Sequence, residues 1–163
     1  MIPDAATLAQ WGLPGLFLVA MVAGSVLPAP SEAVLGALVY AGVGPVSAVG
    51  VATAGNVLGS LTVYLLGVWV ARGGAGPVGR WVQRRAAREG PRLERARARL
   101  AAWGAPALLL AWLPVVGDVF VLAAGLVGVR LGPFVGFVTL GKGLRYLVVA
   151  GSALAARHTG ISP

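Results

Sequence analysis

LPAPSEAVLGALVYAGVGPVSAVGVATAGNVLGSLTVY, which occupies residues 27–64, carries the pattern from which the architecture follows. When the chain is shifted by 86 positions, this stretch aligns without a gap on residues 113–150, LPVVGDVFVLAAGLVGVRLGPFVGFVTLGKGLRYLVVA. Twelve of the 38 aligned pairs are identical, and Pro28 falls on Pro114. We interpret the match as an internal duplication of the kind found in many membrane transporters. The alternative is a shared bias toward Gly, Ala and Val in two apolar segments.

The composition predicts a membrane protein. Of the 163 residues, 58% are hydrophobic and only 11% are charged, whereas soluble domains carry about 25% charged residues. The net charge of +8 is concentrated, because nine of the thirteen Lys and Arg lie between Arg72 and Arg99. Apolar stretches flank this basic segment, so we expect it to face anionic lipid headgroups and not nucleic acid.

The apolar runs differ in length. Residues 46–71 and 131–156 are long enough to cross a hydrocarbon core of about 30 Å. The shorter runs form two pairs, one interrupted by Pro28 and Pro30 and the other by Pro114 and Gly117. Since helix breaks in lipid are tolerated only where protein or water satisfies the backbone, each pair predicts a re-entrant helical hairpin. The alternative for residues 8–27 is an ordinary crossing helix.

These segments predict an all-α integral membrane protein in which each repeat is one proline-broken re-entrant hairpin plus one transmembrane helix. The whole chain, residues 1–163, is then a single membrane domain, with the first repeat at 8–71, a basic segment at 72–100 and the second repeat at 101–157. An odd number of crossings per repeat implies an inverted repeat. The positive-inside rule places the basic segment in the cytoplasm, with a short surface helix at 92–99. The first residues lack a basic region and a cleavage pattern, so we expect no cleavable signal peptide.

Charged side chains inside the apolar segments are the first candidates for a functional site. The alignment places Glu32 opposite Asp118, and the last apolar run carries Lys142 and Arg145 three residues apart. Such groups cost at least about 2.5 kcal/mol in a bilayer, so they usually face a wet cavity and pair with one another. We expect Glu32 and Asp118 to be substrate-site or proton-coupling acids. The structural alternative is that Glu32 with Arg145, or Asp118 with Lys142, forms a static buried ion pair. Arg130 is expected to be an interfacial anchor.

Uncharged polar residues extend this candidate site. Asn56, Ser60 and Tyr64 recur every four residues and so share one helix face, and Tyr146 follows Arg145. We expect Asn56, Tyr64 and Tyr146 to line a polar cavity, with hydrogen bonds between helices as the structural alternative. The small residues of the first long run are expected to permit close helix packing; they are Gly50, Gly55, Gly59 and Gly67.

The residues needed for several enzyme classes are missing. His158 is the only histidine, there is no cysteine, and no phosphate-binding loop of the P-loop form is present. We therefore expect no metal site, no cofactor and no enzymatic activity.

Four motifs together resemble the DedA family, also called SNARE-associated or VTT-domain membrane proteins, and within it the small YqaA-like branch. They are LPAPSE at 27–32, GNVLG at 55–59 with Tyr64, WLPVVGD at 112–118 and GKGLRY at 141–146. The resemblance covers about residues 13–150. It implies two membrane-dipping hairpins in inverted repeat and a multi-pass protein of the bacterial cytoplasmic membrane. It also implies translocation of undecaprenyl phosphate or a phospholipid, with proton coupling in some members.

The resemblance places the essential acid of the family at Glu32. The second acidic position of the family falls on Asn56, which cannot titrate, and the arginine pair of larger members is replaced by Ala111 and by Val116 or Gly117. Lys142 and Arg145 are left as the candidate phosphate ligands. The leading hypothesis is a lipid-phosphate translocase. The alternatives are a proton- or cation-linked exporter of a small solute and a non-transporting membrane scaffold, and the oligomeric state stays open.

Overall fold

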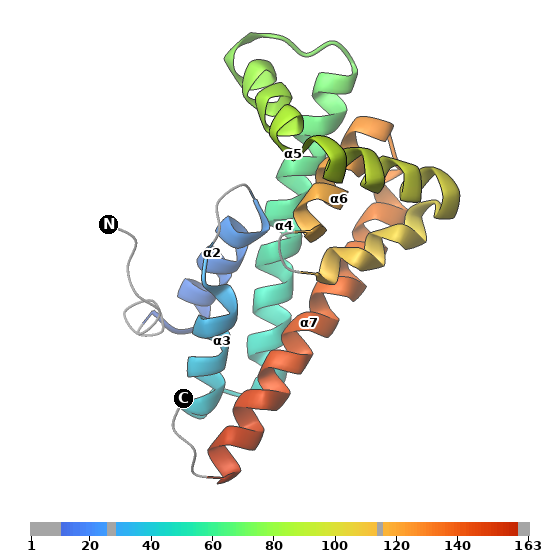
Figure 1. The fold of residues 1–163 in the computed structure, drawn as a ribbon. Helices are drawn as coiled ribbons and strands as arrows, with labels where there is room; N and C mark the ends of the chain where they lie inside the picture. The colour runs from blue at the N-terminus through green and yellow to red at the C-terminus, as the bar shows by residue number, and fades with distance from the viewer. Residues whose placement is uncertain (1–10, 26–28, 114–115, 160–163) are drawn as a thin grey trace. The chain divides into compact units, whose positions relative to one another are not determined.

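The computed structural model describes residues 11–25, 29–113 and 116–159, and within these ranges the chain is helical with no strand. Six α-helices and one 3₁₀ helix follow one another along the described chain (Figure 1). They are α2 (Gly12–Gly24), α3 (Ser31–Tyr40), α4 (Pro45–Ala71), α5 (Gly76–Trp103), η1 (Ala105–Trp112), α6 (Val116–Val127) and α7 (Leu131–Thr159).

Two of these helices, α4 and α7, are long and apolar enough to cross a membrane. They contain 27 and 29 residues, and at about 1.5 Å per residue each exceeds a hydrocarbon core of about 30 Å. Both coincide closely with the two long apolar runs, so this prediction is confirmed. Their first residues, Pro45 and Leu131, are 86 positions apart, which is the offset of the sequence repeat.

The other apolar helices are short. Helix α2 has 13 residues, α3 has 10 and α6 has 12, so none exceeds about 20 Å in length. The first arm of the second predicted hairpin differs from the expectation, because residues 105–112 form the tighter 3₁₀ helix η1. Gly104, which separates η1 from α5, has φ 65°, a conformation that favours glycine and ends the preceding helix.

The basic segment is more helical than predicted. In place of a short helix at 92–99, α5 runs for 28 residues from Gly76 to Trp103. It bends at Gly90, whose φ of 31° is open to glycine, and Pro91 then begins the second half. Proline is tolerated there because the first N–H groups of a helix have no partner within it. The buried residues of this second half, Leu93, Ala96 and Leu100, recur at helical spacing.

The described chain forms two compact units, and both α4 and α7 contribute residues to each. The first unit comprises residues up to Gly59 together with those from Lys142 onward, and in it α2 packs against α3 (Figure 1). Its core consists of apolar side chains from α2, α3, α4 and α7. The second unit comprises Ser60–Gly141, in which α5, η1 and α6 pack on one another.

The turns that follow α3 and α6 have the same backbone geometry. Gly42 has φ 101° and its counterpart in the alignment, Gly128, has φ 78°. The N–H of Val43 donates to Leu38 O at 2.9 Å, and 86 residues later the N–H of Val129 donates to Ala124 O at 3.0 Å. Each helix therefore ends in a left-handed glycine turn, and a long helix begins shortly after it.

Candidate functional site

An ion pair in the first unit joins α3 to α7. An Nη2 atom of Arg145 contacts Oε1 of Glu32, and the two side chains are 24% and 30% exposed. Glu32 lies in the first turn of α3, where the positive end of the helix dipole favours a carboxylate. The structure thus brings together Glu32 and Arg145, one of the two ion pairs that the sequence suggests.

A buried chain of hydrogen bonds lies beside the ion pair. The Tyr146 hydroxyl accepts a hydrogen bond of 2.9 Å from Asn56 Nδ2 and lies 3.0 Å from Ser31 Oγ. Lys142 Nζ donates to Asn56 Oδ1. These four side chains are between 0% and 3% exposed. Because a charged or polar group buried without partners is strongly unfavourable, this network makes the burial of Lys142 tolerable.

Helix geometry explains why these groups meet. Lys142, Arg145 and Tyr146 occupy positions i, i+3 and i+4 of α7 and therefore share one face. Ser31 and Glu32 are the first two residues of α3, where backbone N–H groups have no helical acceptor. We call Ser31, Glu32, Asn56, Lys142, Arg145 and Tyr146 the polar cluster.

Close packing of α2 on α4 fixes the position of Asn56. A side chain on Gly24 would overlap the backbone of Asn56, and one on Gly59 would overlap the backbone at Met21 and Gly24. A Cβ on Gly55 would likewise overlap the backbone at Phe17. The helices can approach this closely only because these residues lack side chains.

The prediction for the four glycines of α4 is correct at three positions. Gly55, Gly59 and Gly67 each lie against the backbone of another helix, in the case of Gly67 at Gly125. The prediction is wrong at Gly50, where an added Cβ would meet nothing within 4 Å. A side chain at position 50 would therefore enter open space, and packing among the described residues does not require glycine there.

Tyr64 does not belong to the polar cluster. It lies in the second unit, where its hydroxyl donates a 2.5 Å hydrogen bond to Val129 O and its ring stacks on Phe134 at a centroid distance of 4.2 Å. The hydroxyl thereby satisfies a carbonyl just beyond the end of α6. This contact corresponds to the structural alternative for Tyr64, a hydrogen bond between elements, and its role in lining a cavity stays a prediction.

Two of the four predicted hairpin breaks, Pro30 and Gly117, lie within the described residues, and they differ in their position relative to a helix. Pro30 precedes α3 with a non-helical ψ of 51°, so it does stand outside a helix. Gly117 is not a break, because α6 already begins at Val116. A Cβ on Gly117 would overlap the backbone of Ala111, so this glycine instead permits contact between α6 and η1. Pro28 and Pro114 lie outside the described residues.

The remaining charged candidates are in the second unit. Asp118 is half-buried in the first turn of α6, as Glu32 is in the first turn of α3. Its pairing with Lys142 stays a prediction. Arg130 is exposed in the turn before α7. No group of three His, Cys, Asp or Glu side chains within the described ranges could hold a metal ion.

Sequence reasoning missed one member of the polar cluster, Ser31. Its hydroxyl contacts a residue 115 positions away in the sequence, a distance over which spacing rules give no information. A signal did exist, since Ser31 immediately precedes the acid that the family resemblance places in the first hairpin.

Comparison with known proteins identifies the family. The VTT domain model matches residues 27–153. The chain is 37% identical over 140 residues to the inner membrane protein YqaA of Escherichia coli K12, covering 85% of this chain and 89% of that one. It is 34% identical over 142 residues to an uncharacterized protein of Haemophilus influenzae, covering 82% of each chain. No solved structure matches. The chain therefore belongs to the VTT-domain, or DedA, family of membrane proteins, as its motifs predict.

Proposed function

We propose that this protein is a membrane transporter that translocates a lipid phosphate, such as undecaprenyl phosphate or a phospholipid, across the cytoplasmic membrane. The observation that carries the proposal is the contact between Glu32 and Arg145 beside the buried Lys142. Two cations and one carboxylate at a helix N-terminus form a site that an anionic headgroup can enter. No chemical step on a covalent bond is needed, so the proposal describes a transporter and not an enzyme.

Arg145 and Lys142 can bind phosphate in different ways. The guanidinium of Arg145 can donate two parallel hydrogen bonds to phosphate oxygens, whereas Lys142 supplies a compact point charge. In the described structure Arg145 is engaged by Glu32, and Lys142 is engaged by Asn56. An entering phosphate has to compete with the Glu32 carboxylate for Arg145.

This competition supplies a route to proton coupling. When Glu32 takes up a proton it loses its charge, and its hold on Arg145 weakens. The guanidinium is then available to the phosphate, and loss of the proton later displaces the phosphate again. Proton uptake by Glu32 and phosphate binding to Arg145 thus favour each other.

The proposed architecture is an inverted repeat. The shared offset of 86 residues between the starts of α4 and α7, and between the turns at Gly42 and Gly128, supports it. The short helices α2, α3 and α6 are too short to cross a bilayer, which favours re-entrant hairpins around a midplane site. We further propose that the protein crosses the inner membrane several times and that the basic segment 72–100 lies in the cytoplasm. The Escherichia coli relative is itself named an inner membrane protein, which supports this location.

The test is translocation of a fluorescent polyprenyl phosphate in proteoliposomes, with and without a pH gradient. Wild type is compared with Glu32→Gln and with Glu94→Gln, which removes an exposed acid of α5. We expect Glu32→Gln to lose the response to the gradient and Glu94→Gln to keep it. Gradient-driven transport that persists in Glu32→Gln would remove Glu32 from the mechanism.

Other experimental results would favour the alternative functions. If no lipid moves but proton-linked uptake of a small solute depends on Glu32, the protein is a solute exporter. If a matched apolar pair at positions 32 and 145 preserves function in cells, the ion pair is structural and the protein is a scaffold.

A further inference from the structure

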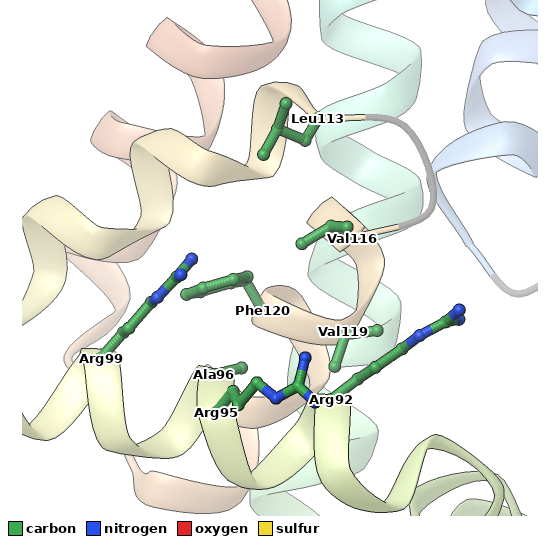
Figure 2. Close-up of a pocket in the computed structure, with 8 residues that line it drawn as sticks. All are labelled: Arg92, Arg95, Ala96, Arg99, Leu113, Val116, Val119 and Phe120. Atoms are coloured by element: carbon green, nitrogen blue, oxygen red, sulfur yellow. The ribbon is translucent and has the colours of Figure 1, made fainter.

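A pocket of about 280 Å³ lies in the second unit, between the second half of α5 and α6 (Figure 2). Three arginines of α5, Arg92, Arg95 and Arg99, line one side of it. They occupy positions i, i+3 and i+7 and therefore share one helix face, and Figure 2 shows them rising from the helix on the side of α6. The bend at Gly90 begins this half of the helix.

The pocket has an excess of positive charge. Arg92 has a weak partner, because its Nη1 is 3.9 Å from Glu89 Oε2. Within the described ranges, no hydrogen bond or ion pair engages Arg95 or Arg99, and no acidic residue lines the pocket. Neighbouring guanidinium groups repel one another, and an anion placed among them removes that repulsion. Phosphate is the anion whose oxygens match the fork of an arginine.

The opposite side of the pocket is apolar. Leu113 and residues of α6 form it, and among them Val119 and Phe120 are each only 3% exposed, whereas Val116 is 39% exposed. A small hydrophilic anion would leave this wall unused. A molecule with a phosphate at one end and hydrocarbon next to it would contact both walls, and a lipid has this chemistry.

We propose that this pocket binds the phosphate headgroup of an anionic lipid. Arg95 and Arg99 donate to the phosphate oxygens, and the carbon atoms nearest the headgroup pack on Val116 and Phe120. We favour a lipid over a free phosphate because the chain belongs to a family of membrane proteins. A basic helix of such a protein can lie at the membrane surface, where lipid headgroups are concentrated. The inference goes beyond the proposed function, because no residue of the polar cluster takes part.

The experiment uses the full-length protein purified in detergent, with lipid binding measured by native mass spectrometry. The probes are dioleoyl phosphatidic acid and dioleoyl phosphatidylcholine. In Arg95→Gln/Arg99→Gln we expect binding of phosphatidic acid to weaken about tenfold or more. This is the change expected when at least one charge-assisted hydrogen bond to the phosphate is lost. The matched control is Arg80→Gln/Arg84→Gln, which removes the same charge from exposed positions before the bend, and we expect it to change binding less than about twofold.

A second variant keeps all the arginines. Val116→Glu places a carboxylate among them from a partly exposed position, and we expect it to weaken binding to a similar degree. Thermal unfolding by circular dichroism checks that each variant is folded. Three results would overturn the proposal: equal loss in the control pair, no preference for phosphatidic acid over phosphatidylcholine, or equally strong binding of glycerol phosphate, which lacks hydrocarbon. None of these results bears on the role of Glu32, so failure here leaves the translocation test intact.

Discussion

Adding one methyl group to α4 is predicted to have opposite effects at two positions nine residues apart. At Gly59 a Cβ would overlap Met21 O and would lie 2.9 Å from Gly24 C, and both contacts are with backbone atoms that no side-chain rotation can move. At Gly50 the added Cβ would meet nothing within 4 Å. Gly59→Ala therefore has to separate α2 from α4, whereas Gly50→Ala does not.

The magnitudes follow from two opposing effects. Replacing glycine by alanine inside a helix favours folding by about 0.5–1 kcal/mol. Overpacking typically costs 1–3 kcal/mol, and we take about 3 because backbone has to move. We expect Gly59→Ala to lower the free energy of unfolding by about 2 kcal/mol and Gly50→Ala to raise it by up to about 1 kcal/mol.

The assay is unfolding of the purified protein in mixed detergent micelles by added dodecyl sulfate, followed by circular dichroism. Gly50→Ala is the internal control, since it makes the same chemical change in the same helix. Equal shifts in the two variants, or a more stable Gly59→Ala, would refute the close approach of α2 and α4 on which the position of Asn56 rests.

Three further predictions concern individual contacts. Tyr146→Phe removes the acceptor of Asn56 Nδ2, and we expect a loss of about 1 kcal/mol in the same unfolding assay, with an unchanged value contradicting the buried network. A double-mutant cycle with Glu32→Gln and Arg145→Gln should give a coupling energy of about 1–2 kcal/mol, between the values for exposed and buried pairs, and additive effects would mean that the pair contributes nothing. Tyr64→Phe should cost about 1 kcal/mol and Tyr64→Ala clearly more, because only the second change also removes the ring stack on α7; equal losses would show that the stack is unimportant.

The sequence predicts the long helices well because their apolar length has few interpretations. Helices α4 and α7 begin within a residue of the predicted runs, and α3 and α6 lie where the shorter runs are. The contact between Glu32 and Arg145 was also within reach, since a charge in an apolar segment requires a partner. Sequence could not establish which acid meets which cation, because that depends on how far each helix is rotated about its axis.

The features that the sequence did not predict depend on neighbouring residues or on the tertiary fold. Gly90 and Pro91 are signals for a loop, yet α5 continues through them with a bend because Pro91 starts the second half. The 3₁₀ geometry of η1 has no marker in ALLLAW, which is equally compatible with an α-helix. The hydroxyl partners of Ser31 and Tyr64 are 115 and 65 residues away, and only the tertiary fold brings them together.

The charge balance of the Glu32–Arg145 pair separates two kinds of substrate. The ionised pair is neutral as it stands, so a phosphate bound at Arg145 adds its whole charge there. A phosphodiester lipid carries one negative charge, and one proton taken up by Glu32 balances it. A phosphomonoester carries about −1.5 to −2 near neutral pH, so protonation of Glu32 balances only part of its charge. Under the proposed function, a diester moves as a neutral complex with one proton, whereas a monoester such as a polyprenyl phosphate reaches neutrality only when the phosphate itself takes up a further proton.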